Sequence, residues 1–124
     1  MVRPHWNLLP FGALDVGPYF GMIDFMVYFT SPAWRESFGR VLAEALAAGK
    51  VVISDAETAS TFGAGVIGAR PEEVDACIAR HLAKPELYRR QVARGQDSLS
   101  RYSASAFTTM FGAVCGRATG RAAA

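Results

Sequence analysis

The most strongly patterned stretch of the chain reads Arg35-Glu36-Ser37-Phe38-Gly39-Arg40-Val41-Leu42-Ala43-Glu44-Ala45-Leu46-Ala47-Ala48-Gly49-Lys50-Val51-Val52-Ile53. Its apolar residues recur at the i, i+3, i+4, i+7, i+8 spacing of one buried helix face, at Phe38, Val41, Leu42, Ala45 and Leu46. This spacing predicts a helix near residues 37–48, followed at once by a buried strand near residues 50–54. Glu36 is expected at or just before the helix start, and Glu44 about two turns along an exposed flank.

Strands and helices alternate through the rest of the chain. Further strands are expected near residues 5–9, 25–29 and 64–68, and further helices near 14–21, 72–83, 86–101 and 104–115. Pro71 and Pro85 each suit a first helical position, where a missing N–H costs nothing. The alternation predicts an α/β fold, a Rossmann-like and mostly parallel sheet with helices on both faces. We expect one domain over residues 1–115 and a flexible tail over residues 116–124, where small residues show no apolar period.

The patterned stretch resembles the donor-binding signature of retaining GT-B glycosyltransferases (glycosyl transferases group 1, the Glu-x7-Glu family). That signature commonly reads Glu-Gly-Phe-Gly, a helix with a second Glu, then Ala-Met-Ala-x-Gly-x-Pro-Val-Ile. Here Ser37 stands where Gly is usual, and Val51 stands where Pro is frequent. The resemblance continues upstream, where residues 24–32 are similar to the family's strand before the first Glu. Downstream, Arg101-Tyr102-Ser103 resembles the stretch that opens the last helix.

The resemblance implies that the chain binds a nucleoside-diphosphate sugar. Glu36 would accept hydrogen bonds from hydroxyls of the donor sugar, and its alternative role is an acid placed favourably at a helix N-terminus. Ser37, Phe38 and Gly39 would bring backbone amides to the sugar and phosphates. Phe38 also fits a position in the core, and Ser37 fits a helix cap.

The same resemblance assigns the next positions to the nucleotide. Val41 and Leu42 would donate amides to the diphosphate while their side chains stay in the core. Glu44 would accept hydrogen bonds from the ribose hydroxyls. Its alternative role is a surface pair with Arg40 at the i, i+4 spacing.

The match covers only the later part of the C-terminal half of a GT-B fold. The Arg/Lys pair that usually grips the donor diphosphate and the acceptor-binding N-terminal half have no counterpart in these 124 residues. We therefore expect an excised domain, a truncated reading frame or one piece of a split enzyme. The fragment would contain no catalytic residue and would be inactive alone. No metal or other cofactor is expected, since the nucleotide-sugar is a substrate.

Charge is distributed unevenly along the chain. Residues 1–79 carry five Lys/Arg and nine Asp/Glu, a net of −4, and residues 80–124 carry eight and two, a net of +6. Arg90, Arg94 and Arg101 would share one face of the helix near residues 86–102. Three interpretations of this face are open. It is exposed to solvent, it docks on an anionic membrane, or it contacts the half of the GT-B fold that these residues do not include. A second hypothesis is accordingly a non-catalytic GT-like α/β domain that binds a protein partner or an anionic membrane surface through its basic C-terminal helices.

Other classes of protein find less support. No apolar run approaches the roughly 18 residues of a membrane span and no signal peptide is evident, so a cytoplasmic location, peripheral to the membrane at most, is expected. Nucleic acid is not an expected partner, because basic-aromatic interleaving is absent. Cys77 and Cys115 fit buried thiols, and His81 fits a packed histidine rather than a catalyst or metal ligand. A receiver- or flavodoxin-like module is a third possibility.

Overall fold

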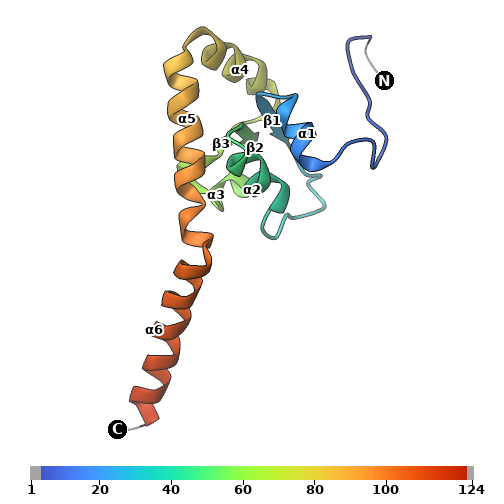
Figure 1. The fold of residues 1–124 in the computed structure, drawn as a ribbon. Coiled ribbons are helices and arrows are strands. Elements are labelled where there is room, and N and C mark those ends of the chain that lie inside the picture. The colour runs from blue at the N-terminus through green and yellow to red at the C-terminus, as the bar shows by residue number, and fades with distance from the viewer. Residues whose placement is uncertain (1–3, 123–124) are drawn as a thin grey trace.

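The computed structural model describes residues 4–122, with side chains given through residue 116. This part of the chain contains six α-helices and three strands (Figure 1). In chain order they are α1 (Val16–Gly21), β1 (Phe25–Tyr28), α2 (Arg40–Ala47), β2 (Val51–Ser54), α3 (Ala56–Ser60), β3 (Ile67–Gly68), α4 (Val74–Ala83), α5 (Pro85–Ser98) and α6 (Ala104–Ala122). Short 3-10 helices occur at Gly63–Gly65, Pro71–Glu73 and Ser100–Tyr102.

The strands form one parallel sheet in the order β1-β2-β3. The register pairs Phe25 with Val51, and Ile53 with Ile67. The mixed α/β class and the parallel sheet predicted from the sequence are confirmed, although the sheet is small. β1 pairs only with β2, so its other edge has no strand partner among residues 4–122, and Val27 on this strand is exposed.

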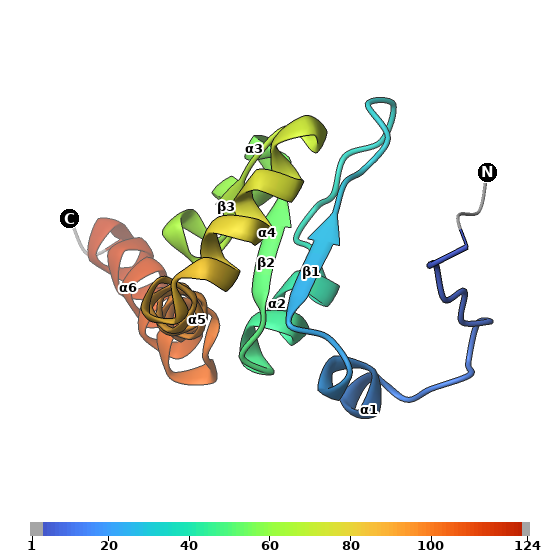
Figure 2. The same cartoon turned by 90° about the horizontal axis from the view of Figure 1, so that it is seen from above.

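Both faces of the sheet contact helices, as Figure 2 shows from above. On one face, Val52 belongs to the main core cluster with Leu42 and Leu46 of α2. Successive strand residues point to opposite faces. On the other face, the ring of Phe25 meets His81 of α4 and Tyr88 of α5 at centroid distances of 6.2 and 5.4 Å.

Left-handed glycines bracket α2. Gly39 is the N-cap residue at φ 79°, and Gly49 has φ 74° just after the C-cap. Because L-residues rarely adopt such angles, the helix begins at Arg40 and not near residue 37 as predicted. Glu36 therefore lies in the loop before α2, farther from the helix start than expected.

Three further features differ from the sequence prediction. The expected strand at residues 5–9 is absent: residues 4–5 form a turn and residues 6–10 are irregular, with Trp6, Leu8 and Leu9 exposed. An apolar run without a neighbouring strand does not stabilise a strand by itself. The short helix α3 was not predicted. Helix α6 continues to Ala122, beyond residue 115, whereas residues 123–124 of the predicted tail lie outside the described residues.

Helix α5 packs against several elements of the domain, among them α2 and the 3-10 helix at Gly63–Gly65. Gly95 lets α5 approach α2 so closely that a Cβ there would lie 2.7 Å from Leu46 Cδ2. The amide of Gln91 donates to the carbonyl oxygens of Ala64 and Gly65 at 3.0 and 3.1 Å. Tyr102, in the turn that follows α5, donates to the Thr61 carbonyl at 2.6 Å.

Beyond that turn, α6 projects away from the sheet (Figure 1). Within residues 4–122, no helix combines the length and apolar character needed to cross a bilayer.

Candidate functional site

A cavity of about 300 Å³ opens at the carboxyl ends of β1 and β2. In parallel α/β sheets, ligands bind at this edge, because loops and helix N-termini converge there. Its walls come from the loop after β1 and from the start of α3, namely Thr30, Ser31, Pro32, Trp34, Arg35, Glu36, Asp55, Glu57 and Thr58. Glu36, the first predicted site residue, thus lines this cavity.

The Glu36 carboxylate is half-buried and held in place from both oxygens. The hydroxyl of Tyr28, the last residue of β1, donates to Oε2 at 2.7 Å. The backbone N–H of Ser37 donates to Oε1 at 3.2 Å. The hydrogen bond to Glu36 is the main cause that raises the pKa of Tyr28 above its ordinary value. A carboxylate has about four acceptor positions, so lone pairs remain for a ligand.

Asp55 also lines this cavity. One of its oxygens accepts the backbone N–H of Thr58 at 2.9 Å, and the other accepts the Thr58 hydroxyl at 2.9 Å. Asp55 is therefore the N-cap of α3, and the hydrogen bond from the Thr58 backbone lowers the pKa of its carboxyl. An acid directly after a buried strand could have been recognised from the sequence, since such a residue falls at the ligand edge.

Acidic groups dominate the electrostatics of the cavity. Three lining side chains are acidic, Glu36, Asp55 and Glu57, and one is basic, Arg35. The Arg35 guanidinium pairs with Glu57 at 3.2 Å. Such a lining favours a hydroxyl-rich or cationic ligand over a bare phosphate. Across residues 4–122, no group of three or more His, Cys, Asp or Glu side chains is arranged to hold a metal ion.

The start of α2 lies beside Glu36 and offers backbone donors. The N–H groups of Leu42 and Ala43 both donate to the Gly39 carbonyl, at 3.0 and 3.2 Å. No acceptor within the described chain pairs with the N–H groups of Arg40 and Val41. Of the two residues predicted to bind the diphosphate, Val41 therefore has an open amide, while the amide of Leu42 is already bonded and its side chain is buried.

Two other predicted residues, Phe38 in the loop before α2 and Glu44 on α2, do not line this cavity. Phe38 packs its ring on Phe62 and Tyr102, at centroid distances of 5.5 and 5.0 Å. Glu44 pairs with Arg40 at 3.0 Å, which is the i, i+4 pair that the sequence left open as an alternative. Phe38 and Glu44 line a separate hollow of about 400 Å³. Glu36 and Glu44 thus belong to different cavities, with the start of α2 between them.

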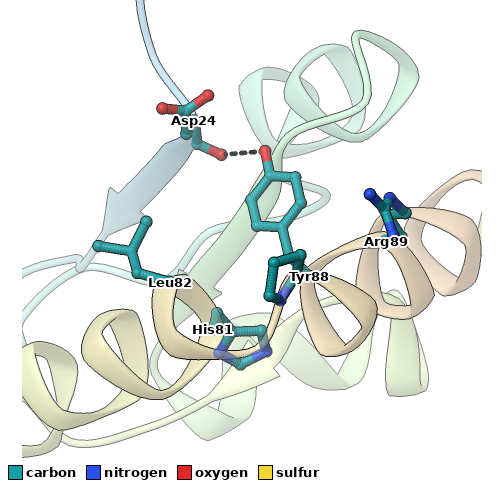
Figure 3. A pocket seen from close by; sticks show the side chains of 6 residues that line it. Asp24, His81, Leu82, Tyr88 and Arg89 are labelled. Carbon is teal, nitrogen blue, oxygen red and sulfur yellow. Dashed lines mark hydrogen bonds between the residues drawn. The ribbon is translucent and has the colours of Figure 1, made fainter.

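A third cavity lies at the other end of the sheet, where the strands begin. It has a volume of about 390 Å³, and Figure 3 shows its lining from Asp24, just before β1, and from α4 and α5. The Tyr88 hydroxyl donates to the backbone carbonyl of Asp24 at 3.0 Å. His81 is 3 % exposed and its Nδ1 lies 2.8 Å from the Cys77 carbonyl, so the expectation of a packed histidine is confirmed. Cys77 is buried as expected, whereas Cys115 is exposed on the projecting helix.

Comparison with protein-family models, with curated proteins and with solved structures found no match to this chain.

Proposed function

We propose that this chain is the donor-binding part of a retaining GT-B glycosyltransferase. It would bind a nucleoside-diphosphate sugar, from which a hexosyl group passes to an acceptor held by an N-terminal half that these residues do not include. The observation that carries the proposal is the position of Glu36, fixed by Tyr28 at the carboxyl edge of a parallel sheet and followed by a helix with open N-terminal amides.

The sugar would bind first to the Glu36 carboxylate. With Tyr28 and the Ser37 amide already bonded to it, the carboxylate keeps its orientation without a ligand. Two vicinal hydroxyls can then donate to the remaining lone pairs, each charge-assisted bond contributing about 1.5–3 kcal/mol. The acidic lining suits this role, because a hexose offers donors and carries no negative charge.

The diphosphate needs positive charge that this cavity lacks. The open amides of Arg40 and Val41 and the positive end of α2 supply part of it. The remainder would come from cationic side chains outside this chain, which agrees with a partial site. The unpaired edge of β1 supports the same view, since it is where further parallel strands of such a half would pair.

Glu44 would take the ribose hydroxyls by exchanging its contact with Arg40. Both side chains are accessible, and an exposed i, i+4 pair contributes only ~0.3–0.5 kcal/mol, so the exchange costs little. Catalysis by the complete enzyme would rest on electrostatic stabilisation of the departing diphosphate. We predict no glycosyl transfer by these 124 residues alone, because the proposed acceptor half of the cleft is not among them.

Saturation-transfer NMR on the purified chain tests donor binding. The ligand panel contains nucleoside diphosphates and their hexose conjugates, at millimolar concentration. Glu36→Gln should reduce binding of the sugar conjugates about tenfold or more, because a charged acceptor is lost. The same substitution should leave the sugar-free diphosphates nearly unchanged, and Glu44→Gln should weaken both classes.

Glu72→Gln is the control, since Glu72 is an exposed acid that pairs with Arg70 and lies outside the cavity. Equal affinities for the Glu36→Gln and Glu72→Gln variants would refute the proposal.

The second candidate is a non-catalytic α/β domain that binds a partner or an anionic membrane through its basic C-terminal helices. The Arg40–Glu44 pair favours it, because the second acid of the motif already has a partner. Silence of the whole NMR panel would favour this candidate.

A further inference from the structure

Helix α6 carries an apolar stripe that nothing in residues 4–122 covers. Phe107, Met110, Phe111 and Val114 are each 60–67 % exposed. Their i, i+3, i+4, i+7 spacing places them on one face of the helix. The rings of Phe107 and Phe111 stack on each other at a centroid distance of 5.9 Å, which makes the stripe continuous. Figure 1 shows the helix standing clear of the sheet and its covering helices, so the stripe is accessible along its length.

The opposite face of α6 is small and weakly polar. It carries Ser105, Thr108, Thr109 and Gly112. The hydroxyls of Thr108 and Thr109 donate to backbone carbonyls one turn earlier, at 2.9 and 3.0 Å. The described part of α6 is therefore amphipathic, with bulky apolar side chains on one side and small or hydroxyl-bearing ones on the other.

The segment that carries the stripe is cationic. Residues 98–124 contain three arginines and no Asp or Glu. On the preceding helix, Arg90 and Arg94 are exposed and form no ion pair with the rest of the described chain. Arg101 lies between the two helices, where it donates to the Thr61 carbonyl and rests over the Tyr102 ring. A binding surface complementary to this segment is apolar and is bordered by negative charge.

We propose that α6 lies in the interface of an anionic lipid bilayer, with Phe107, Met110, Phe111 and Val114 inserted at the boundary of headgroups and acyl chains. The bilayer supplies both of the required features to a single projecting helix, without the shape complementarity that a protein groove demands. The helix lies on the membrane and does not span it, in keeping with its apolar content. This inference rests on the second candidate function and deepens it, because it names the helix and the side chains that meet the membrane. It holds whether or not a nucleotide-sugar binds.

The test is vesicle co-sedimentation of the full 124-residue chain. Vesicles of phosphatidylcholine alone are compared with vesicles in which about a third of the lipid is phosphatidylserine. Binding is expected to the anionic vesicles and to weaken with added salt. The double variant Phe107→Ser/Phe111→Ser should lose about tenfold or more of the vesicle affinity, because two inserted rings are removed. Leu82→Ser is the matched control, since Leu82 is an equally exposed apolar residue (63 %) on α4.

A second variant, Phe111→Trp, reports insertion directly. Its added tryptophan fluorescence should shift to the blue with anionic vesicles, relative to the parent chain with Trp6 and Trp34 alone. This readout decides the proposal even if the double serine variant fails to fold. The proposal is overturned by absent binding to anionic vesicles, or by equal loss in the Leu82→Ser and stripe variants. It is also overturned if the chain dimerises in solution through the stripe, because a second copy would then cover it.

Discussion

Replacing Gly95 by alanine should destabilise the domain, although glycine-to-alanine changes inside helices ordinarily stabilise. The ordinary gain is about 0.5–1 kcal/mol, from lower backbone entropy in the unfolded chain. At this position, however, the added Cβ would lie 2.7 Å from Leu46 Cδ2. Leu46 is 1 % exposed and belongs to the main core cluster, so its side chain can shift only by displacing core neighbours. Overpacking of this kind costs about 1–3 kcal/mol, and we expect a net loss near 1 kcal/mol.

Urea denaturation followed by circular dichroism measures the effect, with the midpoint expected to fall and the slope to stay constant. Gly112→Ala on α6 is the control, because nothing lies within 4 Å of the Cβ it would add, and it should be neutral or stabilising. Leu46→Ala alone should cost about 2–5 kcal/mol, and in that background the Gly95 substitution should become favourable. A Gly95→Ala variant as stable as the parent would refute the close packing of α5 on α2.

Two further predictions concern the walls of the cavity. Asp55→Ala should cost about 0.5–2 kcal/mol through loss of the α3 cap. Because the Thr58 hydrogen bond lowers the pKa of Asp55, this stabilisation is present above the unfolded pKa and is lost as the pH falls through the folded value. Denaturation at neutral and acid pH should show that loss in the parent and less of it in Asp55→Asn, which keeps a neutral cap. In an ultraviolet titration, Tyr28 should ionise above its ordinary pKa, and Glu36→Gln should lower that pKa, since the charged acceptor is removed. An unchanged tyrosine titration in Glu36→Gln would contradict the Tyr28–Glu36 hydrogen bond.

Sequence periodicity predicted the elements whose burial is local and regular. The apolar spacing from Val41 to Leu46 located α2, and the run at Val51 located β2, because both patterns reflect contact with the same core cluster. The start of α2 was misplaced because Phe38 continues the helical spacing, although it packs from the loop against Phe62 and Tyr102. The short helix α3 has no apolar period to detect, and its only local signal is the Asp55 cap.

The candidate site was predictable only in part for a similar reason. Glu36 was recognised as a loop acid between a strand and a helix, because the strand, the loop and the helix follow one another in the chain. The contact of Tyr28 with its carboxylate depends on how the loop returns over the end of β1, which no spacing rule specifies. Asp55 comes to the cavity through pairing of β1 with β2, a contact remote in sequence. The Arg40–Glu44 pair, by contrast, lies on a single helix and was foreseeable as an alternative.

Because Gly39 adopts a left-handed conformation and begins α2, the two acids of the motif lie on different structural elements. Glu44 lies on a helix anchored in the core, whereas Glu36 lies on a loop that is hydrogen-bonded to the end of a strand. Insertions or substitutions in residues 29–35 can therefore reshape the surroundings of the first acid while the second keeps its position. Substitutions selected around Glu36 could change the ligand contacts of Glu36 without changing those of Glu44. The spacing of the two acids in the sequence would not reveal that their surroundings can vary independently.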